Sequence, residues 1–567
     1  MDIKYNTSYQ LKEIINKIRV DKIYNKVFVE INRYVIKKLP YPNISQENYV
    51  PETIEEHLSN LRKLLEEKSK QISNIFSYYE WLYHLRRLPP EFYKGRLKTT
   101  FDYDMSLAIH IASFSKTKTT FLKNNLGVKI ENNRVITLDA KKVRYILRFI
   151  FHIKSLSHID VLIRRISKGV KLIKKSKHDY LPIEVPNQYI QESISIYDKR
   201  MASVHGDAAN LFSRTGLSID KLINNFEQDH IVPEICFINN SSFHKYPITL
   251  CEEGEKVSIA ANYLIHFQEY KIIHEYLKVI NSNEILDLQK ISIIAIFLYL
   301  AVLFIIDKNI NIISFYQTGY VLFNKSSFEK FTKEYFDNVK ETVQKIFFQN
   351  IEGDYQVILS KMKKRSILSY PFDAPGYFEI GYENQICIDL LTCTKMLHSK
   401  LEHKVTDGTL SNTRALHFEK SLQKLIDFTQ YQPDNYIKRL INQKSINFNS
   451  KKITDIDAAF VYNNTLILVS AKSYIYNAKY DKGNYRYIRN TRDKIEKDIQ
   501  EWREKIRFLN KNITGDNYDL SSYGKVQGIV CTPSLFFIGA NYYKSKISCG
   551  IDEYQSAVEL YRLLTSS

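Results

Sequence analysis

The sequence predicts a multidomain α+β protein. We expect a mostly helical N-terminal two-thirds and a C-terminal α/β domain built around a central mixed sheet. Three observations support this fold class. The chain has 567 residues, enough for three or four domains. Its N-terminal regions carry apolar residues at helical spacing, whereas near the C-terminus short apolar runs alternate with amphipathic segments. Proline-containing segments at 180–187 and 369–376 suggest boundaries, which divide the chain into 1–185, 186–370 and 371–567.

The composition is that of a basic globular protein. Hydrophobic residues make up 44% of the chain, and 81 Lys and Arg outnumber 62 Asp and Glu to give a net charge of +19. An excess of positive charge fits a polyanionic partner such as nucleic acid. The six cysteines form no Cys-x-x-Cys pair, which argues against structural zinc and for a reduced protein. With no signal-peptide pattern at the N-terminus, we expect a cytoplasmic protein.

Two N-terminal stretches are expected to be helical. The charged amphipathic stretch 51–87 predicts a helical hairpin or a short coiled coil, which would suit dimerisation. The stretch from Lys141 to Lys177 contains twelve Lys and Arg but only one acid, Asp160. Apolar residues alternate with the basic ones at helical spacing. This pattern predicts two helices, each with one buried and one strongly positive face that could bind phosphates. The expected nucleic-acid-binding residues are Lys141, Lys142, Arg144, Arg148, Arg164, Arg165, Lys168, Lys171, Lys174 and Lys175.

The apolar stretch 291–306 contains no charge, but its sixteen residues are short for a membrane span. We therefore predict a buried core helix there and no membrane partner.

Acidic and basic residues flank two apolar strands of the C-terminal region. Asp457 ends the segment Thr454-Asp455-Ile456-Asp457 before one strand, and Lys472 follows the next strand, Leu466–Ala471. The Asn463-Asn464 turn should fold the strands into a hairpin, so that Asp457 and Lys472 lie side by side at one end of a sheet. Metal-assisted phosphodiester cleavage needs an acid that holds a divalent ion and a fixed ammonium beside it.

This arrangement resembles the PD-(D/E)xK nuclease superfamily over roughly residues 385–567. The family order is a helix with a glutamate, a hairpin with Asp and (Asp/Glu)-x-Lys, a helix and a further strand. Here Glu419 lies on the helix predicted around 418–426. An amphipathic helix follows over 495–509, then a strand over 526–531 and a closing helix over 553–564.

The resemblance implies a DNA endonuclease that depends on Mg²⁺ or Mn²⁺. Asp457 would bind the metal, Glu419 would act through the metal or its water, and the Ala471 carbonyl would also reach the metal. Lys472 would orient the nucleophile and stabilise charge on the phosphate. Domains of this family often occur in restriction and anti-phage defence proteins, and the resemblance therefore implies such a role.

One position departs from the family pattern. Ser470 stands two residues before Lys472, where the pattern has an acid, and a hydroxyl is a poor ligand for a hard cation. One branch of restriction enzymes takes this acid from the following helix, which here carries Asp493, Glu496, Asp498 and Glu501. Asp498 flanks the predicted apolar stripe most closely and is our candidate for the missing acid.

A second motif lies mid-chain. Asp229-His230, followed by Ile231-Val232-Pro233, is similar to the opening of an HNH nuclease motif. The resemblance implies His230 as general base and Asp229 as metal ligand. A helix over 261–277 would add Asn262 and His274 as further metal ligands.

Three functions therefore stay open. The C-terminal site is the predicted nuclease centre, the HNH-like site is the first alternative, and a non-catalytic nucleic-acid-binding subunit of a defence complex is the second. The substrate is expected to be DNA, with RNA not excluded. A homodimer and an accessory defence protein are possible partners, since cutting both strands with one site usually needs two copies.

Overall fold

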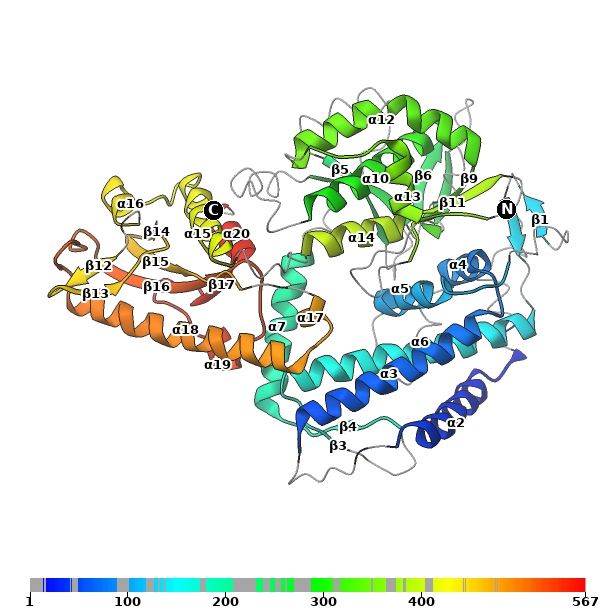
Figure 1. Ribbon diagram of the computed structural model, residues 1–567, viewed down its shortest axis with the longest axis horizontal. Coiled ribbons are helices and arrows are strands. Elements are labelled where there is room, and N and C mark those ends of the chain that lie inside the picture. The colour runs from blue at the N-terminus through cyan, green and yellow to red at the C-terminus, as the bar shows by residue number, and fades with distance from the viewer. Residues whose placement is uncertain are drawn as a thin grey trace.

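The computed structural model shows a mixed α+β protein with long helices and several small sheets, as the sequence predicts (Figure 1). The structure describes residues 14, 17–40, 42, 49–88, 101–118, 127–130, 133–136, 139–173, 180–206, 231–237, 245–249, 256–260, 263–269, 287–308, 315, 318–347, 350–363, 374–380, 384–402, 411–441, 443, 445–474, 476 and 478–565.

Helices dominate the N-terminal part. They are α2 (Val20–Lys38), α3 (Pro51–Ser73), α4 (Tyr78–Arg87), α5 (Phe101–Ala112), α6 (Ala140–Ser167) and α7 (Gln188–Gly206). Two small antiparallel pairs accompany them, β1 (Gly127–Ile130) with β2 (Asn133–Ile136), and β3 (Leu172–Ile173) with β4 (Ile183–Glu184). Helices α3 and α6 run side by side, with α2 packed along α6 (Figure 1).

The stretch 51–87 forms two helices because its sequence contains a second start signal. Pro51 occupies the first turn of α3, where its missing N–H leaves no hydrogen bond unmade. Ser77 and Glu80 form a reciprocal capping box that begins α4. The sequence predicted a helical hairpin or a short coiled coil. Because the chain breaks at residues 74–77 into two helices, the structure agrees better with the first of these.

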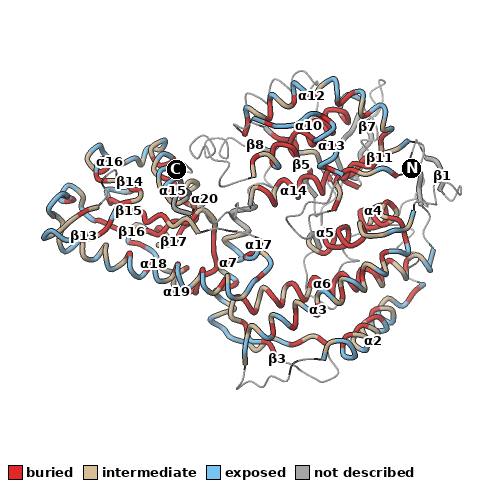
Figure 2. Tube along the Cα trace, viewed as in Figure 1, coloured by how far each residue is buried: buried red, intermediate tan, exposed pale blue. Residues whose placement is uncertain are grey.

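Helix α6 is one helix of 28 residues, whereas the sequence predicted two helices between Lys141 and Lys177. It is buried along most of its length because α2, α3 and α5 pack around it (Figure 2). Even Lys154 is only 2% exposed, and its ammonium lies 3.6 Å from the Asp104 carboxylate. The prediction of a strongly positive face opposite the buried one was therefore wrong for the middle of this segment, where residues 149–157 are all buried.

The middle region surrounds one apolar helix. Its elements are β5 (Ile231–Phe237), β6 (Lys245–Thr249), β7 (Lys256–Ala260), β8 (Tyr263–Glu269), α10 (Leu288–Lys308), β9 (Tyr320–Asn324), α12 (Lys325–Phe347), α13 (Tyr355–Lys363), β10 (Tyr377–Glu379), β11 (Gln385–Asp389) and α14 (Leu390–Glu402). Among the described residues, only α10 is long and apolar enough to cross a membrane, and 83% of its most apolar window is buried inside the protein. Helices α12, α13 and α14 cover α10, as expected for a core helix.

The helix predicted over 261–277 is wrong for Tyr263–Glu269. These residues form strand β8, which pairs antiparallel with β5 from Ile231↔Glu269 to Phe237↔Tyr263. Aromatic and β-branched residues favour an extended chain, and here the partner strand decides the conformation of a short apolar run.

The predicted boundary at residue 371 falls inside the middle region. Strand β11 pairs with β10 on one side and with β9 on the other, so residues 377–379 and 385–389 share a sheet with 320–324. Helix α14 then packs against α10. The C-terminal domain accordingly begins with α15, after residue 410.

The C-terminal domain contains the expected mixed sheet. Its elements are α15 (Ser411–Asp427), α16 (Asn435–Ile441), β12 (Ile446–Phe448), β13 (Lys451–Thr454), β14 (Ala458–Tyr462), β15 (Thr465–Ala471), α17 (Ala478–Asp481), α18 (Tyr485–Lys511), β16 (Lys525–Thr532), α19 (Ala540–Tyr543), β17 (Tyr554–Ser556) and α20 (Ala557–Thr565). The sheet order is β14-β15-β16-β17, with β14 antiparallel to β15 and the other two pairs parallel. The closing helix begins at Ala557, because residues 554–556 form β17, which the sequence did not predict.

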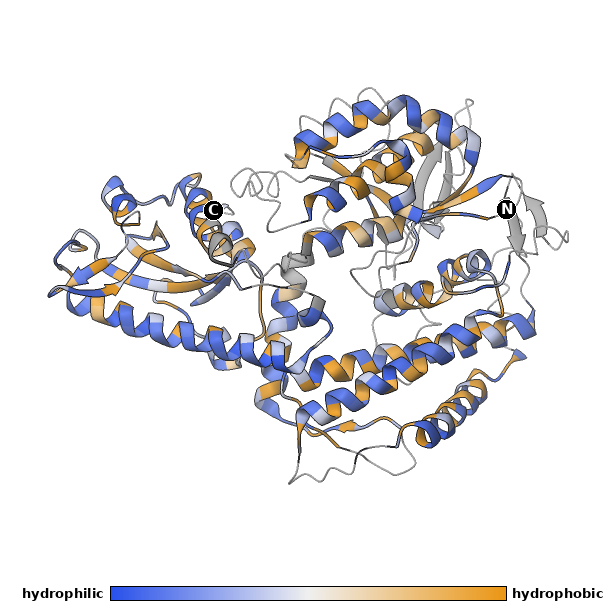
Figure 3. Ribbon diagram, in the orientation of Figure 1, coloured by the Kyte–Doolittle hydropathy of each residue, from blue (hydrophilic) through white to orange (hydrophobic). Residues whose placement is uncertain are grey.

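Helices cover both faces of this sheet. Ile467 and Val469 of β15 pack against α15 and α20, whereas Leu466 and Leu468 share a core with α18. Figure 3 shows mainly hydrophilic residues along α18 and hydrophobic residues along the strands that it covers. A Cβ on Gly528 of β16 would lie 2.5 Å from the indole nitrogen of Trp502, so the close approach of α18 requires glycine there.

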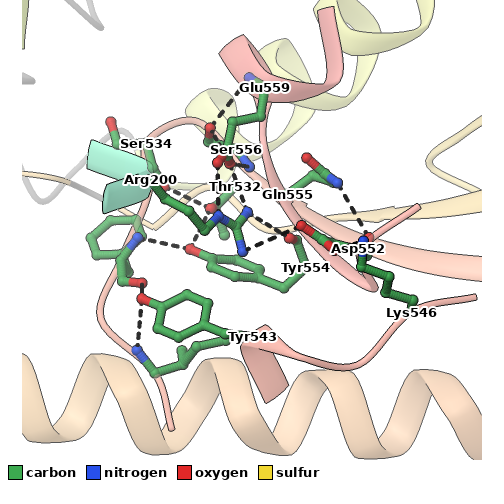
Figure 4. A network of polar contacts seen from close by, with 12 residues as sticks. Arg200, Thr532, Ser534, Tyr543, Lys546, Asp552, Tyr554, Gln555, Ser556 and Glu559 are labelled. Atoms are coloured by element: carbon green, nitrogen blue, oxygen red, sulfur yellow. Dashed lines mark hydrogen bonds and ion pairs between the residues drawn. The ribbon is translucent and has the colours of Figure 1, made fainter. Parts of the chain in front are cut away.

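The C-terminal domain is anchored to the N-terminal helices. Arg200 of α7 donates to both carboxylate oxygens of Glu559 at 2.8 Å and to the Tyr554 carbonyl at 2.9 Å (Figure 4). At the start of α18, the Tyr485 amide donates to Glu55 of α3 at 3.1 Å. Two separate helices of the N-terminal part therefore hold the domain that carries the predicted site.

A buried ion pair predicts where the N-terminal and middle regions are most sensitive to mutation. Arg86 of α4 donates to both oxygens of Asp389 at 2.7 and 2.8 Å, and the two side chains are 1% and 0% exposed. Arg86→Met should leave a buried carboxylate unpaired and lower the free energy of unfolding by about 3 kcal/mol or more, measured by chemical denaturation. Arg148→Met, which breaks the half-exposed pair with Glu30, should cost less than about 1 kcal/mol. Equal losses would contradict this account.

Candidate active site

The two sides of the candidate site are brought together by a tight hairpin. Asn463 and Asn464 join β14 to β15 with φ angles of 46° and 59°, the left-handed conformation that a two-residue hairpin turn requires and that asparagine tolerates. The resulting register pairs Ala458 with Val469. Asp457 and Lys472 therefore lie at the same end of the sheet, as the sequence predicts.

Hydrogen bonds fix the main chain around both residues. The Ala471 amide donates to Oδ2 of Asp457 at 2.8 Å, so the carboxylate acts as an acceptor in place of a main-chain carbonyl just before β14 begins. The Lys472 amide donates to the Cys531 carbonyl of β16 at 2.8 Å. The end of β15 is thus held from both sides.

Helix α15 brings Glu419 to the same end of the sheet. Phe418, Leu422 and Ile426 of this helix are buried against β14, β15 and α20. Gln423, one turn beyond Glu419, accepts a hydrogen bond from the Ala459 amide at 2.8 Å on the outer edge of β14. This contact fixes the helix against the strand that follows Asp457 and blocks part of an open sheet edge.

The charges of this site are strongly coupled. Burial and the neighbouring Glu419 carboxylate raise the pKa of Asp457 to about 7, against the opposing effects of the Ala471 amide and Lys472. Burial, followed by the charge of Asp455, raises the pKa of Glu419, and Lys472 again opposes the shift. Among these three side chains, two carboxyl groups thus stand against one ammonium, so acidic groups are in excess.

A divalent cation would relieve this excess. Among the described residues, no three His, Cys, Asp or Glu side chains are arranged to hold a metal ion. Mg²⁺ often binds through one or two carboxylates and retains several waters, so Asp457 and Glu419 fit this ion without a third acid. The Ala471 carbonyl remains a predicted further ligand.

The structure gives Asp498, the candidate for the missing acid, a different partner. Ser470 is 5% exposed, and Asp498 on α18 accepts a hydrogen bond from the Tyr474 hydroxyl at 2.6 Å. Glu496, the other acid that we considered, accepts from the Gly539 amide at 2.8 Å. Both carboxylates are thus engaged with loops that follow β15 and β16.

The structure does not describe the four residues of the HNH-like motif, so it does not test this site. Asp229, His230, Asn262 and His274 lie outside the described residues. The segment between Asn262 and Glu269 is a strand rather than the helix that the motif implies.

The basic residues of α6 and its C-terminal flank differ in their surroundings: some form ion pairs or ring contacts, and others are exposed. Arg148 pairs with Glu30 at 2.8 Å, Arg165 with Glu184, and Lys168 with Asp198 at 3.3 Å. Arg164 lies over the Tyr103 ring at 5.2 Å. Lys141, Arg144 and Lys171 are exposed, Lys142 is half-buried, and Lys174 and Lys175 lie outside the described residues. Much of the segment's charge therefore has a partner within the protein, and nucleic-acid binding by the exposed residues stays a prediction.

Sequence reasoning missed three residues that shape the site. Asp455 stands in the acidic segment before β14 and raises the pKa of Glu419. Gln423 is a polar residue one turn beyond Glu419, a spacing that could have indicated a contact with the same strand. Nothing in the sequence pairs Tyr474 with Asp498.

Comparisons of this chain with protein-family models, curated proteins and solved structures find no match.

The raised pKa of Asp457 predicts a pH-dependent stability. Because the pKa of Asp457 in the folded state lies above the ordinary aspartate value of 3.8, the folded protein between about pH 4 and about pH 7 retains a proton that the unfolded chain has lost. Stability should therefore fall as pH rises from about 4 to about 7 and then level off. Asp457→Asn should remove this contribution, so that the variant melts at a higher temperature than the parent at pH 8 but not at pH 4. Asp493→Asn, which changes an exposed carboxylate on α18, serves as control. A parent-like pH profile in Asp457→Asn would contradict the assignment.

Proposed function

We propose that this protein is a metal-dependent DNA endonuclease of the PD-(D/E)xK type and that its reaction centre comprises Asp457, Glu419 and Lys472. The order of elements supports the proposal: a helix with Glu419, a hairpin with Asp457 and Lys472, the long helix α18 and the parallel strand β16 follow one another as in that family. The observation that carries it is the hairpin register, which brings Asp457 and Lys472 to one end of the sheet, where the Asp457 carboxylate accepts from the Ala471 amide.

The chain's own residues would divide the work as follows. Asp457 and Glu419 would hold Mg²⁺ or Mn²⁺, and Asp457 must lose its proton to do so. A bound ion of this kind neutralises charge on the phosphate and lowers the pKa of a coordinated water. Lys472 would lie beside the scissile phosphate, where a fixed ammonium stabilises the negative charge that grows as water attacks phosphorus. The anchored amides of Ala471 and Lys472 limit the motion of these groups.

The net charge of +19 supports a nucleic-acid substrate. The exposed Lys141, Arg144 and Lys171 are candidates for phosphate contacts. A role in restriction or anti-phage defence, in the cytoplasm and with a second copy or an accessory protein, follows from the resemblance alone.

A non-catalytic nucleic-acid-binding subunit is the second candidate function. The observation that favours it is Ser470, which stands where the family motif has an acid, while Asp498 accepts a hydrogen bond from Tyr474.

The proposal predicts that purified protein converts supercoiled plasmid DNA to nicked or linear forms in Mg²⁺ or Mn²⁺, with chelator abolishing the reaction. Lys472→Ala should lower the cleavage rate at least about a hundredfold, since it removes charge stabilisation in the transition state. Lys497→Ala, which removes an ammonium from a 75% exposed side chain on α18, should leave the rate unchanged.

Other outcomes would assign the chemistry elsewhere. Cleavage that survives Lys472→Ala but is lost in His230→Ala would overturn the proposal in favour of the HNH-like site. Binding of DNA or RNA without cleavage, under conditions where Asp457 is ionised, would favour the non-catalytic subunit.

A further inference from the structure

Asp498 and Tyr474 form a short hydrogen bond between α18 and the segment that follows β15. The hydroxyl donates to Oδ2 at 2.6 Å, and both residues are half-buried. A hydroxyl bound to a carboxylate at this distance is among the stronger hydrogen bonds in proteins. The bond therefore fixes the start of this segment against a rigid helix.

The fixed segment is the one that carries Lys472. The Tyr474 amide donates to the Lys472 carbonyl at 2.8 Å, and the Lys472 amide donates to the Cys531 carbonyl. From Asp498, a continuous path of one side-chain and one main-chain hydrogen bond reaches Lys472. The neighbouring Ala471 amide donates to the Asp457 carboxylate.

Aromatic contacts join this segment to the loop that follows β16. The Tyr474 ring meets the Phe536 ring edge-on at 6.3 Å between centroids. Phe537 donates its amide to the Tyr480 hydroxyl at 2.6 Å, and Gly539 donates to Glu496 at 2.8 Å. Asp498 and Glu496, two residues apart on α18, thus anchor the two loops that leave the ends of β15 and β16.

We propose that Tyr474 and Asp498 are a positioning pair for Lys472, and that Asp498 contributes to the reaction by holding Tyr474 rather than by binding metal. The inference rests on the proposed function, because it assigns the pair to the catalytic lysine. Lys472 has a long flexible side chain, and a displacement of its main chain by about 1 Å could cost a hundredfold in rate. Because Ser470 has no carboxylate, the proposed reaction depends at this end of β15 on the position of Lys472.

Three substitutions separate positioning from metal binding. Tyr474→Phe removes the donor and Asp498→Ala removes the acceptor, so each should lower kcat roughly tenfold to a hundredfold. Both should leave KM and the Mg²⁺ concentration at half-maximal rate unchanged. Asp498→Asn keeps an oxygen that accepts from the Tyr474 hydroxyl and should stay within about threefold of the parent. The double variant Tyr474→Phe/Asp498→Ala should be no slower than the worse single variant, since both remove one interaction.

If Asp498 bound the metal instead, the effects of the substitutions on the rate and on the Mg²⁺ requirement would be reversed. Asp498→Asn would then raise the Mg²⁺ requirement and lower the rate, while Tyr474→Phe would cleave normally, and this result would overturn the inference. Parent-like kcat in Tyr474→Phe and Asp498→Ala would also overturn it. Rates are normalised to folded protein by melting curves, so that simple unfolding is not scored as lost positioning. If Lys472→Ala itself still cleaves, the proposed function fails, and this is distinguishable from failure of the pair.

Discussion

The C-terminal domain holds two carboxylates together in a partly buried place, at a cost in free energy. Glu419 comes from a helix and Asp457 from the start of a strand, and each would be more stable in water, away from the other charges. The pKa of about 7 at Asp457 records this cost. Functional sites commonly carry such perturbed groups, because a ligand of opposite charge reverses the penalty. Under the proposed function, that ligand would be a divalent cation held by the two carboxylates.

The rest of the domain can be understood as the scaffold that enforces this proximity. Strand β15 is buried along its whole length between β14 and β16, which fixes Ala471 and Lys472. Helix α15 is secured by its apolar face and by Gln423. Contacts with α3 and α7 then tie the domain to the N-terminal helices through Arg200 and Glu55.

Local patterns predicted the parts of the site that local physics determines. The Asn463-Asn464 turn and the alternation of apolar residues specify the hairpin, and the hairpin alone brings Asp457 next to Lys472. The spacing of Ile495, Ile499 and Trp502 specifies the face of α18 that packs on the sheet.

The failures share a cause, because each depends on a partner distant in sequence. Residues 263–269 form a strand since β5 is available to pair with them. The charges of α6 are partly internal because Glu30, Glu184 and Asp198 come from other elements. Asp498 was predicted to complete the metal site from its position on the helix, and that position could not show that a tyrosine 24 residues away in the chain donates to its carboxylate.

The most direct test of the central claim is a calorimetric titration of Mn²⁺ into the protein, carried out at pH 6, 7 and 8 in buffers of different ionisation enthalpy. If Asp457 and Glu419 hold the cation, binding should tighten as pH rises and should release a fraction of a proton that is largest at the lowest pH. Asp457→Asn should abolish both the tight binding and the proton release. Unchanged Mn²⁺ binding in Asp457→Asn would contradict the account, because Asp457 would then have no role in holding a metal.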